Sequence, residues 1–289
     1  MSLPRTLSPD APPGLDLART LSPLRMGVSD PCWHAAPDGS WSWATRTPAG
    51  ALTLRLRPAD GGVAAEAWGP GADWAPALLP GLLGVHDRPE RLVADGPVAE
   101  LVARYPGFRL ARSARVADAA LAGVCRRGVS AFEAGRAWSL MVEAMGDDAP
   151  GPGGLRLPPA PRRVAASEPY DLHVLGLEAQ RADEVRRIAS HAPRLELEGG
   201  EPPAGVVDRL RGIAGLGADA VDHARSVALG APDALPVVDG HHRAALVEVL
   251  ARPDAPAADA EALLEAHRPQ RGRVVRLVGL SLEAAAEAG

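Results

Sequence analysis

The sequence predicts an α+β protein in which a β-rich N-terminal domain precedes a larger all-α domain. Apolar and polar residues alternate with a period of two in the first part of the chain, which is typical of strands with one buried face. Five of the six tryptophans lie in the same part. From about Asp87 onward, apolar residues recur every three or four positions, as in amphipathic helices. A length of 289 residues is sufficient for one large or two modest domains.

The chain begins with a predicted tail and a predicted sheet. Residues 1–18 are rich in proline and serine, and we expect them to be disordered. Residues 19–95 form the predicted β-rich domain, an antiparallel sheet with helices. Its clearest strand covers residues 51–57, where leucine alternates with threonine and arginine. Turn-forming clusters at 47–50 and 58–62 flank this strand.

Residues 96–289 form the predicted all-α domain. Val116 and Val124 share one face of a helical pattern near its start. The segment 146–163 is rich in proline and glycine, and we interpret it as a linking loop without regular structure. Helical spacing resumes at 180–192 and continues nearly to the end of the chain.

Composition excludes several classes of function. Lysine is absent, so all 31 basic side chains are arginine, and a lysine Schiff base is not available to this chain. The net charge of -5 argues against a protein that coats nucleic acid through bulk charge. Cys32 and Cys125 are too few for a disulfide framework and lack the spacing of a zinc site, so we expect a reducing cytoplasm. Residues 1–14 lack the apolar segment of a signal peptide, and no run of 18 apolar residues predicts a membrane span.

The segment 206–230 predicts two short helices joined by a tight turn. Val206 and Leu210 fall on one helical stripe, two glycines occupy the turn at 214–217, and a second apolar stripe ends at Gly230. Such a turn exposes backbone N–H groups, and the second helix directs the positive end of its dipole the same way. The hairpin therefore predicts a phosphate-binding site that needs no lysine.

Two other interpretations of this hairpin remain open. The letters GLGADA at 215–220 match the dinucleotide fingerprint G-x-G-x-x-A, which would indicate a small-molecule enzyme. That fingerprint requires a buried apolar strand before it, whereas Asp208, Arg209 and Arg211 occupy this region. An ordinary helical hairpin with glycines in its turn is the third interpretation.

Asp239 is a second candidate, about twenty residues beyond the hairpin. It stands at the start of a predicted helix that ends before Pro253, so it is a candidate N-cap. The helix dipole would also hold its carboxylate ionised, which suits the stabilisation of a developing cation. His241 and His242 point about 100° apart on a helix, which is unfavourable for joint metal binding.

The hairpin and Asp239, at this spacing, resemble the helix-hairpin-helix superfamily of DNA glycosylases. Further segments resemble its 3-methyladenine DNA glycosylase II type, in the actinobacterial form. Each segment is short, but their order and spacing are specific and extend over about residues 20–278. The segments are SPLRMG (22–27), TRTPAGALTLRL (45–56), AEAWGPGADWA (65–75), YPGFRLARS (105–113), HVLGLEAQRADEVRRIA (173–189), APRLE (192–196) and LLEAHRPQRGRVVRL (263–277).

The resemblance implies a monofunctional enzyme of base excision repair, with the hairpin in its all-α domain. Such an enzyme flips an alkylated base, for example 3-methyladenine or 7-methylguanine, out of duplex DNA and hydrolyses its N-glycosidic bond. Asp239 falls on the catalytic aspartate of the family, which stabilises the oxocarbenium-like sugar and directs water to it. We further expect a cytoplasmic, nucleoid-associated monomer with duplex DNA as partner, and no cofactor, metal or membrane. The implied phosphate-binding residues of the hairpin are Gly215, Leu216, Gly217, Ala218 and Ala220.

Several residues depart from the family pattern. The residue expected to fill the gap left by the flipped base aligns with Gly128, which has no side chain, so we expect Arg126 or Arg127 to take this role. Asp219 places a negative charge where a phosphate should bind. These departures leave open a second hypothesis, a catalytically degenerate paralogue that binds DNA without excising a base.

The base pocket is the least defined part of the predicted site. Aromatic residues make up only 3% of the chain, and Leu172 stands where the family has a tryptophan. Trp68, Trp138 and Tyr170 are candidates for stacking on an alkylated base, and core packing is the alternative role of each.

A predicted basic patch lies near the end of the chain. It is either a solvated helix face or a set of contacts to DNA phosphates. Its residues are Arg268, Arg271, Arg273 and Arg276.

Overall fold

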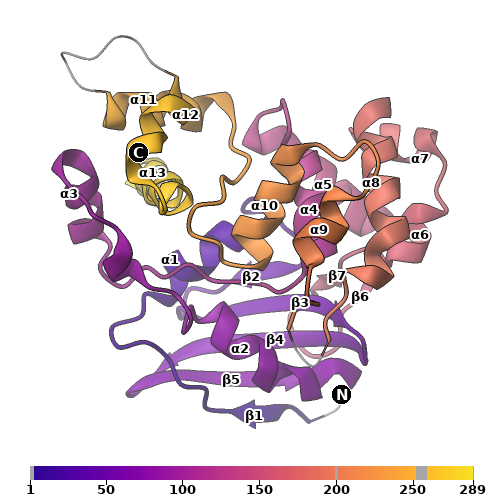
Figure 1. Ribbon diagram of the computed structural model, residues 1–289. Helices are drawn as coiled ribbons and strands as arrows, with labels where there is room; N and C mark the ends of the chain where they lie inside the picture. The colour runs from indigo at the N-terminus through magenta and orange to yellow at the C-terminus, as the bar shows by residue number, and fades with distance from the viewer. Residues whose placement is uncertain (1–2, 199–200, 252–258, 289) are drawn as a thin grey trace.

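A five-stranded antiparallel sheet forms the lower part of the molecule in Figure 1. The computed structural model describes residues 3–198, 201–251 and 259–288. The strands lie in the order β1-β5-β4-β3-β2, and helices follow, so the predicted α+β class is confirmed. The strands are β1 (Arg5–Leu7), β2 (Trp33–Ala35), β3 (Trp41–Thr47), β4 (Gly50–Ala59) and β5 (Gly62–Trp68).

β4 contains the strand predicted at residues 51–57 and pairs with β3 and β5 on its two sides. The side chains of Leu52 and Leu54 are fully buried on one face, as the period-two pattern requires. Trp43 pairs with Leu54 across the strands and stacks on Trp33, with 5.3 Å between the ring centroids. The tryptophans of this region therefore stabilise the sheet and its core.

The predicted disorder of residues 1–18 is wrong for residues 3–18. β1 pairs with β5 at the edge of the sheet, with Thr6 opposite Glu66. Arg5 also forms an ion pair with Asp73. Composition indicated disorder, but an edge strand needs only a few backbone hydrogen bonds, which proline and serine at neighbouring positions do not prevent. Residues 1–2 lie outside the described part.

The helices form two groups above the sheet, with α4 to α10 on the right of Figure 1 and α3 with α11 to α13 on the left. None of the described helices is long and apolar enough to cross a membrane. Their bounds are α1 (Leu17–Leu21), α2 (Ala75–Leu82), α3 (Gly96–Arg104), α4 (Val116–Arg126), α5 (Ala131–Met145), α6 (Pro161–Ala165), α7 (Pro169–His173), α8 (Ala179–His191), α9 (Val206–Arg211), α10 (Ala218–Ala228), α11 (Gly240–Leu250), α12 (Ala260–Leu264) and α13 (Arg271–Ala288).

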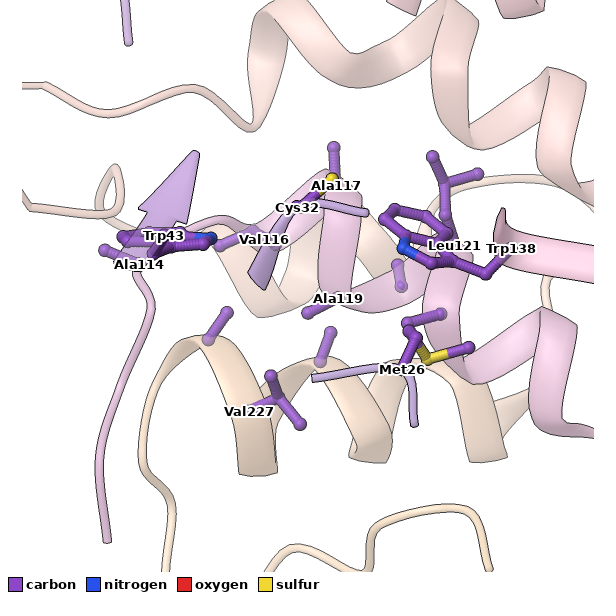
Figure 2. Packing of buried hydrophobic residues seen from close by; sticks show 14 of the residues in the cluster. Met26, Cys32, Trp43, Ala114, Val116, Ala117, Ala119, Leu121, Trp138 and Val227 are labelled. Atoms are coloured by element: carbon purple, nitrogen blue, oxygen red, sulfur yellow. The ribbon is translucent and has the colours of Figure 1, made fainter. Parts of the chain in front are cut away.

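Two hydrophobic cores correspond to these groups. The first joins the sheet to α4, α5, α8 and α10, and Figure 2 shows Trp43, Val116, Trp138 and Val227 within it. The second is formed by α3, α11, α12 and α13. The cores do not follow the predicted domain boundary at residue 95, because helices of the C-terminal part complete the core of the sheet.

The two central helices, α4 and α10, approach each other closely at Gly123. A Cβ atom placed on Gly123 would lie 2.9 Å from Cβ of His223 and 3.1 Å from Cα of Ala220. Small residues at this crossing therefore bring α10, the second helix of the hairpin, directly against α4.

The segment 146–163 contains some regular structure, contrary to the prediction. Two short strands, β6 (Asp147–Asp148) and β7 (Arg156–Leu157), pair with each other. Leu157 is buried beside Ala44 of β3. This tertiary contact fixes a segment whose composition predicts a loop.

Candidate active site around Asp239

The carboxylate of Asp239 accepts hydrogen bonds from the first turns of two helices. Its Oδ1 accepts the backbone N–H of His242 in α11 at 2.9 Å, which makes Asp239 the N-cap of that helix. Its Oδ2 accepts the backbone N–H of Ala131, the first residue of α5, at 3.0 Å. Because α5 belongs to the first core and α11 to the second, one carboxylate joins the two groups of helices.

These contacts keep the carboxylate charged. Burial raises the pKa of Asp239, while the backbone N–H groups of His242 and Ala131 lower it, and the pKa lies below the ordinary value of 3.8. The N-terminal ends of both helix dipoles act in the same direction. Asp239 is therefore an anion at neutral pH, and a weak acceptor of protons.

A cavity of about 750 Å³ opens beside Asp239. Five carboxylates and two arginines line it, so its walls carry net negative charge, and the lining contains no phenylalanine, tyrosine or tryptophan. A cavity of this kind favours a cationic ligand over a neutral one. The lining comes from the α4–α5 loop and α5, α10, the segment before α11, α11 itself and α12: residues 127–130, Glu133, Ala218, Asp219, Asp222, 235–241, Arg243 and Glu261.

Two histidines position the backbone around Asp239. The buried His223 of α10 accepts the backbone N–H of Val237 on its Nδ1 at 3.0 Å, and so holds the segment that leads to Asp239. Burial lowers the pKa of His223 well below 6.5, so this ring is neutral and can accept. His242 donates from Nε2 to the carbonyl oxygen of Val275 in α13, at 2.9 Å. Within the described part of the chain, no group of three or more His, Cys, Asp and Glu residues could hold a metal ion.

The predicted hairpin is present as α9, a glycine turn and α10. Residues Val206–Arg211 are helical, so the buried strand that a dinucleotide fingerprint requires is absent, and that interpretation is wrong. Gly215 has φ of +73°, a conformation that favours glycine, and the N–H of Leu216 closes the turn onto Ile213 at 3.1 Å. The backbone N–H groups of Gly217 and Ala218 find no acceptor among the described residues and remain available to an anion.

The Asp219 side chain occupies part of this turn. Its Oδ1 accepts the N–H of Ala220 at 2.9 Å, so, together with that of Leu216, two of the five predicted phosphate donors are already bound. Arg127 neutralises it, donating from Nε to Asp219 Oδ2 at 2.5 Å. The same guanidinium donates to both oxygens of Glu184 in α8, at 2.7 and 2.9 Å, and Glu184 is only 1% exposed. Arg127 thus links α4, α8 and the hairpin.

Neither Arg126 nor Arg127, the residues expected to fill the gap left by a flipped base, extends from the surface. Arg127 is held between two carboxylates, and Arg126 is partly buried and donates from Nη2 to the carbonyl of Arg25 at 3.1 Å. Gly128 has φ of +70°, and a Cβ atom placed on it would meet no heavy atom within 4 Å. The loop therefore presents open space at Gly128, and both neighbouring guanidinium groups are engaged inside the protein.

The three aromatic candidates for the base pocket do not line the cavity beside Asp239. Trp68 packs against Gly151, and Trp138 lies in the first core (Figure 2). Nε1 of Trp138 donates to Asp30 at 2.9 Å. Tyr170 is 72% exposed on α7, which lies across the molecule from α11 in Figure 1.

The predicted basic patch is largely neutralised within the protein. Arg268 and Arg271 both form ion pairs with Asp233 and Glu265. The other two side chains point inward: Arg273 pairs with the carboxylate of Asp87, and Arg276 donates to the carbonyl of Pro23 and to the hydroxyl of Ser226.

Two residues near the site escaped the sequence analysis. Phe132, the second residue of α5, is 79% exposed next to the Ala131 N–H that binds Asp239. The guanidinium of Arg187 in α8 stands over the hairpin turn, where Nη2 would lie 3.0 Å from a Cβ on Gly215. It forms no ion pair with the residues that the structure describes. A single phenylalanine at the polar start of a helix could have identified Phe132 from the sequence. The sequence does not distinguish Arg187 from any other arginine on a helix surface.

Known proteins were compared with the chain by sequence and by structure. No protein-family model and no curated protein sequence matches it. A 3-methyladenine DNA glycosylase from Archaeoglobus fulgidus is similar in structure, with a TM-score of 0.71 and 18% identity over 95% of both chains. The 8-oxoguanine glycosylase/lyase of Clostridium acetobutylicum, in complex with double-stranded DNA, gives a TM-score of 0.64 at 12% identity, over 92% of this chain and 90% of that one. Its apo form gives 0.65 at 11% identity, over 96% and 98%.

The chain shares the fold of these solved structures. Identities of 11 to 18% make this a likeness of fold, and two glycosylases with different substrates share it. The substrate and the reaction must therefore be inferred from the residues around Asp239 and not from the fold.

Proposed function

We propose that this protein is a monofunctional DNA glycosylase that removes positively charged alkylated purines from duplex DNA. The observation that carries the proposal is the carboxylate of Asp239, which is held ionised by the N-terminal turns of α5 and α11 at the wall of an acidic cavity. The hairpin helix α10 contributes to the same wall. A site for charge stabilisation therefore adjoins a site for a DNA phosphate.

Asp239 acts by electrostatics in this proposal. Breaking the bond between C1′ and the base leaves positive charge on the sugar, and a carboxylate about 4 Å away stabilises it by roughly 4 kcal/mol at an effective dielectric constant of 20. Each oxygen accepts one backbone N–H and keeps a further lone pair for the sugar or for water. A pKa below 3.8 makes Asp239 a weak general base, so charge stabilisation is its principal role.

The reaction needs only water as a second reactant. The C1′–N bond breaks with its electron pair on the base, so a cationic alkylpurine such as 3-methyladenine or 7-methylguanine leaves as a neutral molecule. The water oxygen forms the new bond to C1′, and its proton passes to solvent. Because the chain contains no lysine, an imine with a lysine amine cannot form, and the abasic strand is left intact.

The acidic lining of the cavity supports a cationic base as substrate. Five carboxylates against two arginines attract a positively charged purine more strongly than an uncharged one such as 8-oxoguanine. The lining has no aromatic ring to form a cation–π cage, so charge is the source of selectivity in this proposal.

Contact with the DNA backbone rests on few groups. The free N–H groups of Gly217 and Ala218 would bind one phosphate, and Arg187 above Gly215 would neutralise it or its neighbour. With a net charge of -5 and Asp219 in the turn, we expect weak binding that weakens further with salt. We also propose that the protein acts as a monomer in the cytoplasm, on nucleoid DNA.

The test is a base-release assay on duplexes that contain 7-methylguanine, 3-methyladenine or 8-oxoguanine. The proposal predicts release of the alkylated bases only, without strand cleavage, and a loss of about a hundredfold or more in Asp239→Asn. The matched control is Asp148→Asn, which removes an exposed carboxylate far from Asp239 in the sequence and should be fully active. Binding of duplex DNA without release of any base would instead support the catalytically degenerate paralogue.

A further inference from the structure

Base flipping leaves a gap in the duplex, and the loop before α5 has no evident side chain to fill it. An unfilled gap costs a few kcal/mol of stacking, so some group must replace the base if flipping is to be efficient. Gly128 has no side chain, and both guanidinium groups beside it are engaged inside the protein. The filling group must therefore come from another residue near Asp239.

Phe132 has the position and the chemistry for this role. It follows directly on Ala131, whose N–H binds the Asp239 carboxylate. Helical side chains lean toward the helix N-terminus, and the loop on that side of Phe132 has open space at Gly128. Its ring is 79% exposed, whereas the other phenylalanine of the chain, Phe108, is buried.

The start of α5 is a rigid platform for this ring. Ser130 caps the helix by accepting the N–H of Glu133 at 3.2 Å, and the Glu133 carboxylate accepts the N–H of Ser130 at 2.9 Å. Together with the bond to Asp239, this capping box fixes the first turn relative to the carboxylate. A ring on such a turn loses little further freedom when it enters DNA.

We propose that Phe132 inserts into the base stack of the duplex and fills the gap left by the flipped nucleotide. This inference rests on the proposed glycosylase function and assigns to Phe132 the role that Gly128 cannot perform. Stacking of a base on an aromatic ring contributes enough affinity that its loss lowers binding by about fivefold to a hundredfold. The ring acts on any sequence, because every base offers a π-face.

The experiment compares binding to two duplexes, one intact and one with a tetrahydrofuran abasic analogue, whose gap needs no flipping. A 2-aminopurine next to the analogue reports stacking by fluorescence. The wild type should prefer the abasic duplex and quench the probe, Phe132→Ala should lose about tenfold of that preference and the quenching, and Phe132→Trp should retain both. Val174→Ala, which shortens another exposed apolar side chain at the end of α7, should behave as the wild type. Thermal unfolding of all variants should be unchanged, because both side chains are exposed.

Two other outcomes separate this inference from the proposed function. If the wild type prefers the abasic duplex and Phe132→Ala keeps the preference and the quenching, the role of Phe132 is contradicted and the glycosylase proposal stands. If the wild type shows no preference for the abasic duplex and releases no base, the proposed function fails, and the role of Phe132 fails with it.

Discussion

Asp239 and Ala131 are 108 residues apart in the sequence, and Oδ2 of the first accepts the backbone N–H of the second at 3.0 Å. The same carboxylate caps α11 through His242. The contact joins the two helix groups at the wall of the acidic cavity. The Asp239 side chain therefore supplies a negative charge to the cavity and also connects the two hydrophobic cores.

Removal of the Asp239 carboxylate should destabilise the protein in two steps. Asp239→Asn keeps an oxygen for the N–H of His242 but presents an amide group to one of the two donors, so we expect a loss of about 1 kcal/mol in the free energy of unfolding. Asp239→Ala loses both acceptors and should cost about 1–2 kcal/mol more. Urea unfolding measures both, and equal stability of the two variants would contradict the double cap.

The lowered pKa of Asp239 should appear in the acid limb of stability. A carboxylate whose pKa is lower in the folded than in the unfolded state stabilises the fold above the unfolded pKa, near 3.8, and this contribution disappears as the pH falls through the folded pKa. The difference in unfolding free energy between wild type and Asp239→Asn should thus be constant from pH 7 to about 5, and shrink below about 4. A difference that grows on acidification has the wrong sign for this account.

His223 should make stability depend on pH in the neutral range. Its folded pKa lies well below 6.5, so the neutral ring stabilises the fold above pH 6.5, and stability declines as the pH falls below that value. The Oδ1 of asparagine can replace Nδ1 as acceptor for the N–H of Val237 without titrating. His223→Asn should therefore be less stable at pH 8 but lose less stability between pH 7 and 5; His242, whose pKa is also lowered, is unchanged in both proteins. Parallel pH curves would contradict this role.

The ion pair between Arg127 and the buried carboxylate of Glu184 should stabilise the fold. Arg127→Met leaves Glu184 buried without a partner, and we expect a loss of about 3–5 kcal/mol. Adding Glu184→Met should restore much of that loss, since no buried carboxylate is then left without a partner and Asp219 is partly exposed. Thermal and urea unfolding of the single and double variants measure the coupling, and additive losses would exclude it.

Replacement of Asp219 should strengthen DNA binding. Asp219→Ser removes the anion from the hairpin, frees Arg127 in part and keeps a side-chain oxygen that can accept the N–H of Ala220. We expect affinity for duplex DNA to rise severalfold and its salt dependence to become steeper by about one unit. Asp148→Ser changes the net charge equally at a distant, exposed position, so an equal gain there would attribute the effect to bulk charge alone.

Local patterns predicted the elements well and the contacts poorly. Alternation located β4, and the glycine turn located the hairpin between α9 and α10, because both depend on neighbours in sequence. The N-cap role of Asp239 was predictable for the same reason. Its second bond, to Ala131, depends on the packing of two cores and leaves no trace in the sequence around either residue.

The charges show the same limit. Asp219 was recognisable as an anion in the hairpin, but its neutralisation by Arg127, and the burial of Glu184 beneath both, required the fold. The terminal arginines formed a basic patch in the sequence, whereas their partners Asp233 and Asp87 come from other segments. Ion pairs between distant segments are set by tertiary structure, so charge runs overestimated the free positive surface.

The central claim is that the ionised carboxylate of Asp239 catalyses the release of cationic bases. The most direct measurement is the rate of release of 7-methylguanine from duplex DNA by the wild type and by Asp239→Asn, with equal folding confirmed by circular dichroism. The account predicts release with an intact strand in the wild type and a loss of about a hundredfold or more in the variant. Equal rates in the two proteins, or no release by a folded wild type, would contradict it.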